Sequence, residues 1–171
     1  MSKSRARKKE NRFVVFGDRE LNRAVEMGYK IDTLFYREGC DEEIIEVQSE
    51  DVFELSTALF DRVSMRSGSE DVIAVLETKS HHINDIFVNN DSRILVLEAP
   101  EKPGNIGAIL RSCDAANVDL VILTNEKCDI YNPNVIRSSV GTFFSNKIVS
   151  MENESALNFL KNNSLYYNFL E

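Results

Sequence analysis

A tight turn, an amide side chain and an arginine follow one another in one short stretch of the chain. Gly104 and Asn105 come after an apolar run at 93–97 and open a helical repeat that contains Arg111. A helix start offers unpaired N–H groups to an anion or a hydroxyl, and Gly104 and Gly107 would let the backbone approach such a ligand closely. Arg111 lies roughly 140° around the helix from its first apolar residue, so its guanidinium can project past the strand end. Spacing alone favours this site and an ordinary turn with a surface arginine about equally.

The elements around this turn would place it at the edge of a parallel sheet. A second apolar run, 119–124, follows the helix at once. Strand, turn, helix and strand within about thirty residues predict a βαβ unit with parallel strands. Ligands of such sheets lie beyond the carboxyl ends of the strands, where we expect Gly104 and Asn105.

A second candidate group of residues follows the βαβ unit. Asn132 is a suitable helix cap, and Pro133 suits the first helical position. The predicted helix ends at Gly141 and would bring Arg137 and Ser139 to the same strand-end edge. The alternative is a surface helix with one arginine.

Two segments carry a resemblance to a known family. PGNIGAILR at 103–111 and DIYNPNVIRSSVGTFF at 129–144 resemble, in order and spacing, two motifs of the SpoU (TrmH-like) family of RNA 2′-O-ribose methyltransferases, which belong to the SPOUT class. The resemblance implies an α/β knotted domain, a homodimer and S-adenosylmethionine as the methyl donor. It implies ribosomal RNA as the substrate class, with transfer RNA as the alternative.

The resemblance also implies roles for five residues. Arg111 and Asn105 would be catalytic, and Gly104, Arg137 and Ser139 would bind the substrate. A guanidinium keeps its proton in proteins, so we expect Arg111 to bind a phosphate and to stabilise the alkoxide rather than to act as a base. Asn105 would hold the turn and bond either Arg111 or the ribose.

The amino-terminal part, residues 1–88, reads as a small α/β domain. We expect strands at 12–17, 31–36 and 72–76, a helix at 18–27 capped by Asp18, and a helix at 50–60 capped by Ser49, while 41–47 is ambiguous. This part resembles the family's RNA-binding substrate domain, except that Phe16 stands where the family pattern has a glutamate. Residues 79–91 are polar and predict a linker, so 89–171 would be the amino-terminal part of the methyltransferase domain.

The charge of the chain is unevenly distributed. The net charge is −8, and residues 1–12 hold six Lys and Arg against Glu10, which is +5 and leaves −13 on the remaining residues. A basic arm on an acidic body can bind RNA phosphates, and it can equally be a frayed terminus that orders only on RNA.

The carboxyl-terminal part predicts a strand at 147–150, a helix capped by Asn153 and a final strand at 165–170. The family's Gly-x-Glu-x-x-Gly and Ser-Leu-Asn stretches, which build the cofactor pocket and the knot, do not occur in the sequence. We therefore expect an incomplete chain without the knot, whose cofactor-binding residues are unknown. The alternatives are a non-catalytic RNA-binding remnant and, with little weight, another kind of nucleotide-binding enzyme.

Several classes of protein fit the sequence poorly. No apolar run is long enough for a membrane helix, and no signal-peptide core follows Met1. The three cysteines, Cys40, Cys113 and Cys128, lack Cys-x-x-Cys spacing and predict free thiols in a reducing cytoplasm. The neighbours His81 and His82 cannot share one helix face, so we expect no metal site.

Overall fold

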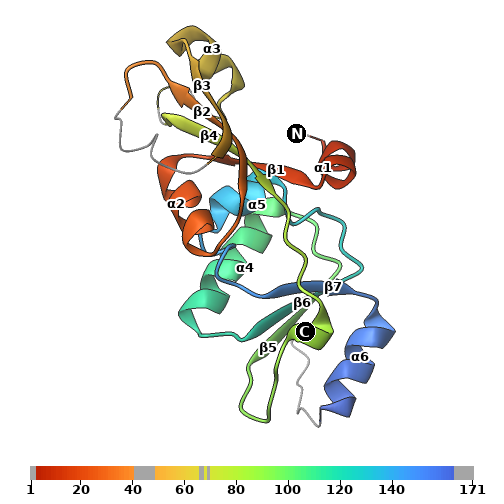
Figure 1. Cartoon of the computed structure of the whole chain (residues 1–171). Coiled ribbons are helices and arrows are strands. Elements are labelled where there is room, and N and C mark those ends of the chain that lie inside the picture. The colour runs from red at the N-terminus through yellow and green to blue at the C-terminus, as the bar shows by residue number, and fades with distance from the viewer. Residues whose placement is uncertain (1–2, 41–48, 66–67, 69, 164–171) are drawn as a thin grey trace.

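A computed structural model describes residues 3–40, 49–65, 68 and 70–163, and it confirms the predicted α/β class (Figure 1). The first unit contains α1 (Ser4–Glu10), β1 (Arg12–Phe16), α2 (Asp18–Glu26), β2 (Ile31–Arg37), β3 (Ser49–Leu55), α3 (Thr57–Val63) and β4 (Val72–Glu77). Its four strands form one sheet in the order β1-β4-β2-β3. β4 runs antiparallel to β1 and β2, whereas β2 and β3 are parallel.

The second unit contains the predicted βαβ arrangement. Its elements are the 3-10 turn η2 (Ile83–Asp85), β5 (Ile94–Glu98), α4 (Pro103–Ala115), β6 (Leu120–Thr124), α5 (Pro133–Ser138), β7 (Ile148–Met151) and α6 (Asn153–Asn162). The three strands are parallel and lie in the order β5-β6-β7. All five residues of the central strand β6 are buried, as a strand covered on both faces requires.

Local sequence signals explain where α4 and α5 begin. Pro103 occupies the first turn of α4, where its missing N–H costs no hydrogen bond. The side chain of Asn132 accepts a hydrogen bond from the backbone N–H of Asn134 at 2.9 Å, which confirms the predicted cap of α5. α5 ends at Ser138, earlier than predicted, and Gly141 follows with φ of 86° in a further turn.

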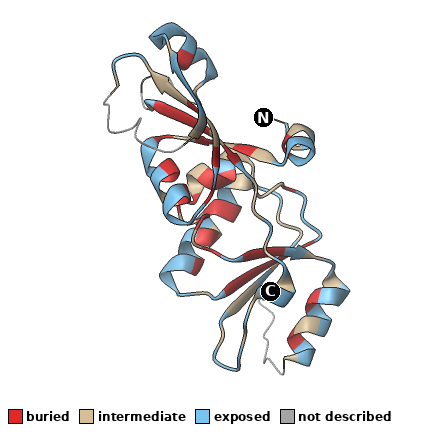
Figure 2. Cartoon of the chain, viewed as in Figure 1, coloured by how far each residue is buried: buried red, intermediate tan, exposed pale blue. Residues whose placement is uncertain are grey.

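The two units share one hydrophobic core. The ring of Phe13 in β1 lies 4.6 Å from the ring of Tyr131 and 6.3 Å from that of Phe144, and Tyr29 contacts Phe144 at 5.1 Å. The Tyr131 hydroxyl donates to the carbonyl of Lys79 and accepts from its N–H. Figure 2 shows buried residues from the strands of the first sheet through α4 and α5 to β6 and β7. The sheets are therefore fixed to each other by packing.

Two predicted features of the elements are wrong, and a third is incomplete. Residues 49–55 form β3 and the next helix is α3, because pairing of β3 with β2 overrides the helical spacing predicted for 50–60. Asp18 and Asn153 each lie one residue inside their helices instead of at the cap. Residues 79–91 are more than a polar linker, since Ile83, Ile86 and Val88 pack against the second sheet.

Some predicted features lie outside the described residues. They are the ambiguous segment at 41–47, the final strand at 165–170 and the question of a knot. A strand at 147–150 corresponds to β7, and the parallel β5 and β6 confirm the two apolar runs as strands.

Candidate functional site

Helices α4 and α5 meet at Gly107. A Cβ atom on Gly107 would lie 2.0 Å from Ser138 Oγ, 2.6 Å from the carbonyl oxygen of Val135 and 2.7 Å from the N–H nitrogen of Ser139. Gly107 is therefore required for helix packing and does not face a ligand, contrary to the sequence expectation. A Cβ atom on Gly104 would meet no atom within 4 Å, so the backbone of Gly104 is open to an approaching molecule.

Arg111 and Asn105 are exposed residues of α4. Arg111 follows Gly107 by one helical turn and lies about 9 Å along the axis from Asn105, at roughly 1.5 Å per residue. Neither side chain makes a hydrogen bond or an ion pair with another described residue, so the suggested bond between Asn105 and Arg111 is not formed. Arg111 lies two turns beyond the helix start, so it is farther from the strand ends than the sequence suggested.

Arg137 and Ser139 differ in their accessibility. Arg137 is half-buried in α5, and its guanidinium has no hydrogen-bonding or ionic partner among the described residues. Ser139 is fully buried; its hydroxyl donates to the carbonyl of Ile136 at 2.6 Å and accepts from the N–H of Phe143 at 3.1 Å. Through these two hydrogen bonds, Ser139 stabilises the turn after α5.

The basic arm is docked on the second unit, a feature that sequence reasoning missed. Residues 4–10 form α1, and Arg7 is 2% exposed. Its Nε and Nη2 atoms lie 2.8 and 2.7 Å from Asp129 Oδ2. Asp129 also accepts from the N–H of Tyr131 at 2.9 Å, so the arm is tied to the loop before α5. The pair is 122 residues apart, and no local signal in the sequence indicates it.

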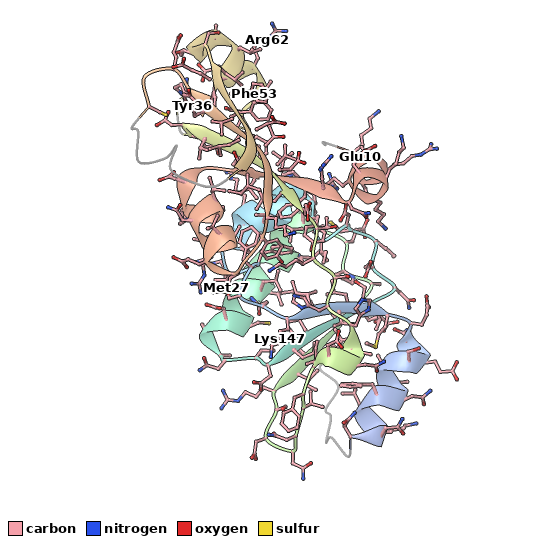
Figure 3. The ribbon with its side chains drawn as sticks, viewed as in Figure 1. Glu10, Met27, Tyr36, Phe53, Arg62 and Lys147 are labelled. Carbon is pink, nitrogen blue, oxygen red and sulfur yellow. The ribbon has the colours of Figure 1, made fainter. Side chains whose placement is uncertain are left out.

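The cations of α1 other than Arg7, and Lys3 just before the helix, point to solvent. Lys3, Arg5, Lys8 and Lys9 are exposed, and Glu10 at the end of α1 is labelled in Figure 3. Because α1 is held by Arg7, these charges have a defined place beside the 126–132 loop. The expectation of a frayed terminus is wrong for the described part of the arm.

The carboxyl edge of the second sheet carries one polar atom without a partner. Thr124, in register with Glu98 and Met151 at the strand ends, is 1% exposed, and its hydroxyl has no hydrogen-bonding partner among the described residues. Glu98 accepts a hydrogen bond from the Asn153 side chain at 2.9 Å. Ligands of parallel sheets lie at this edge, but one hydroxyl supplies a single contact.

Burial favours the uncharged forms of one histidine and two cysteines. Burial lowers the pKa of His81 below its usual value, and the charges of Lys79 and Lys147 lower it further. Burial raises the pKa of the Cys113 and Cys128 thiols, both of which are inside the protein. Within the described ranges, no three His, Cys, Asp or Glu side chains gather as a metal ion would require.

None of the helices that the structure describes combines the length and the apolar character of a membrane-crossing segment.

The two units match two different family models. Residues 92–169 match the model of the SpoU rRNA methylase family. Residues 1–74 match the model of the MRM3-like substrate binding domain. The carboxyl-terminal part of the chain is thus similar to the SpoU rRNA methylase family, and the amino-terminal part to the MRM3-like substrate binding domain. The family segment at 92–169 contains both motifs described above, together with α4 and α5.

Two curated relatives of the chain are RNA methyltransferases. It is 30% identical over 145 residues to the 23S rRNA (uridine(2479)-2′-O)-methyltransferase of Streptomyces viridochromogenes, covering 81% of this chain and 50% of that protein. It is 28% identical over 107 residues to the 23S rRNA (guanosine(2553)-2′-O)-methyltransferase RlmP of Bacillus subtilis, covering 63% of this chain and 41% of that protein. The chain thus spans half of these relatives or less.

Solved structures share the arrangement of both units. The SpoU methyltransferase AviRb from Streptomyces viridochromogenes, in complex with the cofactor AdoMet, superimposes with a TM-score of 0.82 at 26% identity, covering 95% of this chain and 63% of that one. A structure described as an RNA 2′-O ribose methyltransferase gives a TM-score of 0.79 at 29% identity, covering 95% and 64%. The SpoU fold therefore extends over nearly the whole chain.

Proposed function

We propose that this chain is the RNA-binding and amino-terminal catalytic part of an enzyme that methylates a ribose 2′-hydroxyl of ribosomal RNA, with S-adenosylmethionine as the methyl donor. One observation carries the proposal: the SpoU segment presents Arg111 and Arg137 on neighbouring helices, each without a hydrogen-bonding or ionic partner among the described residues. Cations without protein partners at a helix pair are suited to RNA phosphates.

The residues of α4 and α5 have separate tasks in this proposal. Arg111, which stays protonated, binds the phosphate beside the reacting ribose and stabilises the negative charge that develops on the 2′-oxygen. Asn105 orients the ribose, and the open backbone at Gly104 admits it. Arg137 binds a second phosphate, and Ser139 supports the turn behind it. Alignment of the hydroxyl in this way can lower the barrier by up to about 7–11 kcal/mol.

The methyl donor is proposed from the family alone. S-adenosylmethionine would supply the methyl group that is transferred to the ribose oxygen. At the strand ends of the second sheet, the Thr124 hydroxyl lacks a partner among the described residues, and the Glu98 carboxylate already bonds Asn153. We therefore assign no cofactor-binding residue in this chain.

The organisation of the protein follows from the same proposal. Residues 1–88 are the substrate-binding domain and 89–171 begin the methyltransferase domain. The complete protein is a homodimer in the cytoplasm and acts in ribosomal RNA processing. The 23S RNA is the first substrate to test, because both curated relatives named above are 23S rRNA methyltransferases.

Methyl transfer by the complete polypeptide that contains this chain tests the proposal. Tritiated S-adenosylmethionine and unmodified 23S RNA should give a methylated ribose, detected as a dinucleotide that resists alkaline hydrolysis. Arg111→Ala should lower the rate at least about 100-fold, since loss of positioning alone can cost that much. It should leave the unfolding midpoint unchanged, because the exposed side chain has no partner among the described residues.

Lys161→Ala, which changes an exposed cation on α6, is the matched control and should retain full activity. Methylation of a base, or a normal rate for Arg111→Ala, would contradict the proposed chemistry.

A further inference from the structure

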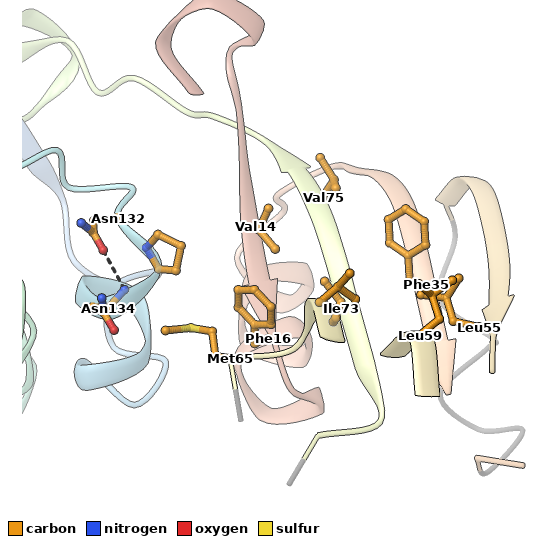
Figure 4. A pocket seen from close by; sticks show the side chains of 12 residues that line it. Val14, Phe16, Phe35, Leu55, Leu59, Met65, Ile73, Val75, Asn132 and Asn134 are labelled. Carbon is orange, nitrogen blue, oxygen red and sulfur yellow. Dashed lines mark hydrogen bonds between the residues drawn. The ribbon is translucent and has the colours of Figure 1, made fainter. Parts of the chain in front are cut away.

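One face of the first sheet lines a cavity that has no part in the proposed reaction. Phe13 and Val15 of β1 are buried in the core that the two units share, whereas Val14 and Phe16 alternate with them and face the other side. On that side lies a cavity of about 820 Å³ (Figure 4). Its wall consists of Val14, Phe16, Phe35, Leu55, Leu59, Val63, Met65, Ile73, Val75, Asn132, Pro133 and Asn134.

The cavity joins the two family domains. Its apolar wall comes from β1, β2, β4 and the α3 region of the first unit, and its polar end is the start of α5 in the second. Its size lies within the range of roughly 300–1,000 Å³ that is usual for small-ligand pockets. None of its lining residues is charged.

The lining has two chemical parts. Phe16 and Phe35 present aromatic rings, and Phe35 stacks on Phe53 of the outer strand β3 at 5.7 Å and 22°. At the other end, Asn132 uses its amide oxygen to cap α5, and its amide nitrogen has no partner among the described residues. The Asn134 side chain is exposed and is likewise without a hydrogen bond in the described part of the chain.

A flat apolar wall with amide groups at one end fits a flat molecule that is polar along its edge. Unpaired nucleobases have this shape, and proteins hold them by stacking on aromatic rings and by hydrogen bonds to their edges. Asn134 and Arg137 are three residues apart on α5, so they lie on one side of the helix. A base bound at Asn134 therefore brings the backbone of the same RNA chain toward Arg137, which we propose binds a phosphate.

We propose that this cavity binds an unpaired nucleobase of the RNA substrate, stacked on Phe16 and bonded by Asn132 and Asn134. The inference rests on the proposed function, because it requires RNA as the partner. The uncharged wall takes the base and leaves the phosphates outside, where Arg137 lies. The cavity thereby anchors the RNA at the join of the two units.

The methyl group of Met65 is a direct reporter of the cavity. The 171-residue chain, labelled with carbon-13 at its methionine methyl groups, is titrated with a random-sequence single-stranded RNA hexamer. A base in the cavity should shift the Met65 methyl resonance by its ring current. The resonances of Met27 and Met151, which do not line the cavity, should stay in place. An abasic hexamer should leave Met65 unshifted as well.

Binding of the same hexamer to a pair of phenylalanine variants tests the stacking. Phe16→Leu keeps an apolar side chain but removes the aromatic face, and it should weaken binding at least about fivefold, which is the lower end for one lost base stack. Phe87→Leu is the matched control, because Phe87 is 83% exposed and outside the cavity, and its affinity should equal that of the wild type.

Three results would overturn the inference. If the wild type binds the hexamer while Phe16→Leu binds equally well and Met65 does not shift, the cavity is not a base site, although the proposed function stands. If Met65 shifts with protein concentration in the absence of RNA, the face binds a second copy of the chain. If the wild type binds no RNA at all, both the inference and the proposed function fail.

Discussion

At the scale of single residues, two glycines that look alike in the sequence have different tasks. Gly104 and Gly107 lie in the same helix turn, and both seemed suited to a close approach of ligand. The structure shows open space beside Gly104 and the backbone of α5 beside Gly107. The distinction depends on a helix that begins 26 residues later in the chain, so local spacing could not reveal it.

Alanine at each position tests this difference. Gly107→Ala should lower the free energy of unfolding by about 1–3 kcal/mol, because its Cβ atom overlaps Ser138 and the α5 backbone and the helices must separate. Gly104→Ala should have no such cost and should gain stability of up to about 1 kcal/mol from helix propensity. Urea unfolding of both variants gives the comparison. Equal destabilisation would show that the helices are not in close contact at Gly107.

At the scale of elements, the amino-terminal helix has a fixed position because of one buried ion pair. The side chains of Arg7 and Asp129 are 2% and 9% exposed. The pair joins α1 to the loop that leads into α5, and the same loop supplies Tyr131 to the shared core. The sequence showed the charge of the arm but not its attachment, because the partner lies in the other unit.

Removal of either side chain of the Arg7–Asp129 pair should destabilise the protein. Arg7→Met leaves the carboxylate of Asp129 in a largely buried place and should lower the free energy of unfolding by about 3–5 kcal/mol. Adding Asp129→Asn should recover part of the loss, because the remaining amide can still accept a hydrogen bond from Tyr131. Lys8→Met, at an exposed neighbour, is the control. Urea unfolding that shows the same stability for Arg7→Met and Lys8→Met would mean that the pair does not hold the arm.

At the scale of the whole molecule, the shared core sets where the proposed RNA substrate would lie. Phe13, Tyr29, Tyr131 and Phe144 form one aromatic group across the join. The first sheet, α4 and α5 therefore keep one relative position. A strand of RNA that contacts the first unit then meets Arg137 and Arg111 from a defined direction, which is the positioning that the proposed reaction needs.

The parts of the fold that could be predicted depend on local signals. The β5–α4–β6 unit and the start of α5 follow from apolar runs, from Pro103 and from the Asn132 cap. β3 could not be predicted, because its extended form depends on pairing with β2. The burial of Ser139, the place of Arg7 and the cavity beside Phe16 each require contacts between distant segments.

The binding of unmodified 23S RNA transcript to this chain tests the central claim most directly. Fluorescence anisotropy should be measured over a series of salt concentrations for the wild type, for Arg111→Gln/Arg137→Gln and for the α6 control Lys161→Gln. The wild type should bind, and the double variant should bind about tenfold more weakly or worse, as the loss of one charged hydrogen bond would already give. For the double variant, the slope of log K against log salt concentration should also be smaller by about 1–2. The Lys161→Gln variant should match the wild type in both affinity and slope. No binding by the wild type, or a double variant with wild-type affinity and slope, would contradict the assignment of α4 and α5 to the RNA.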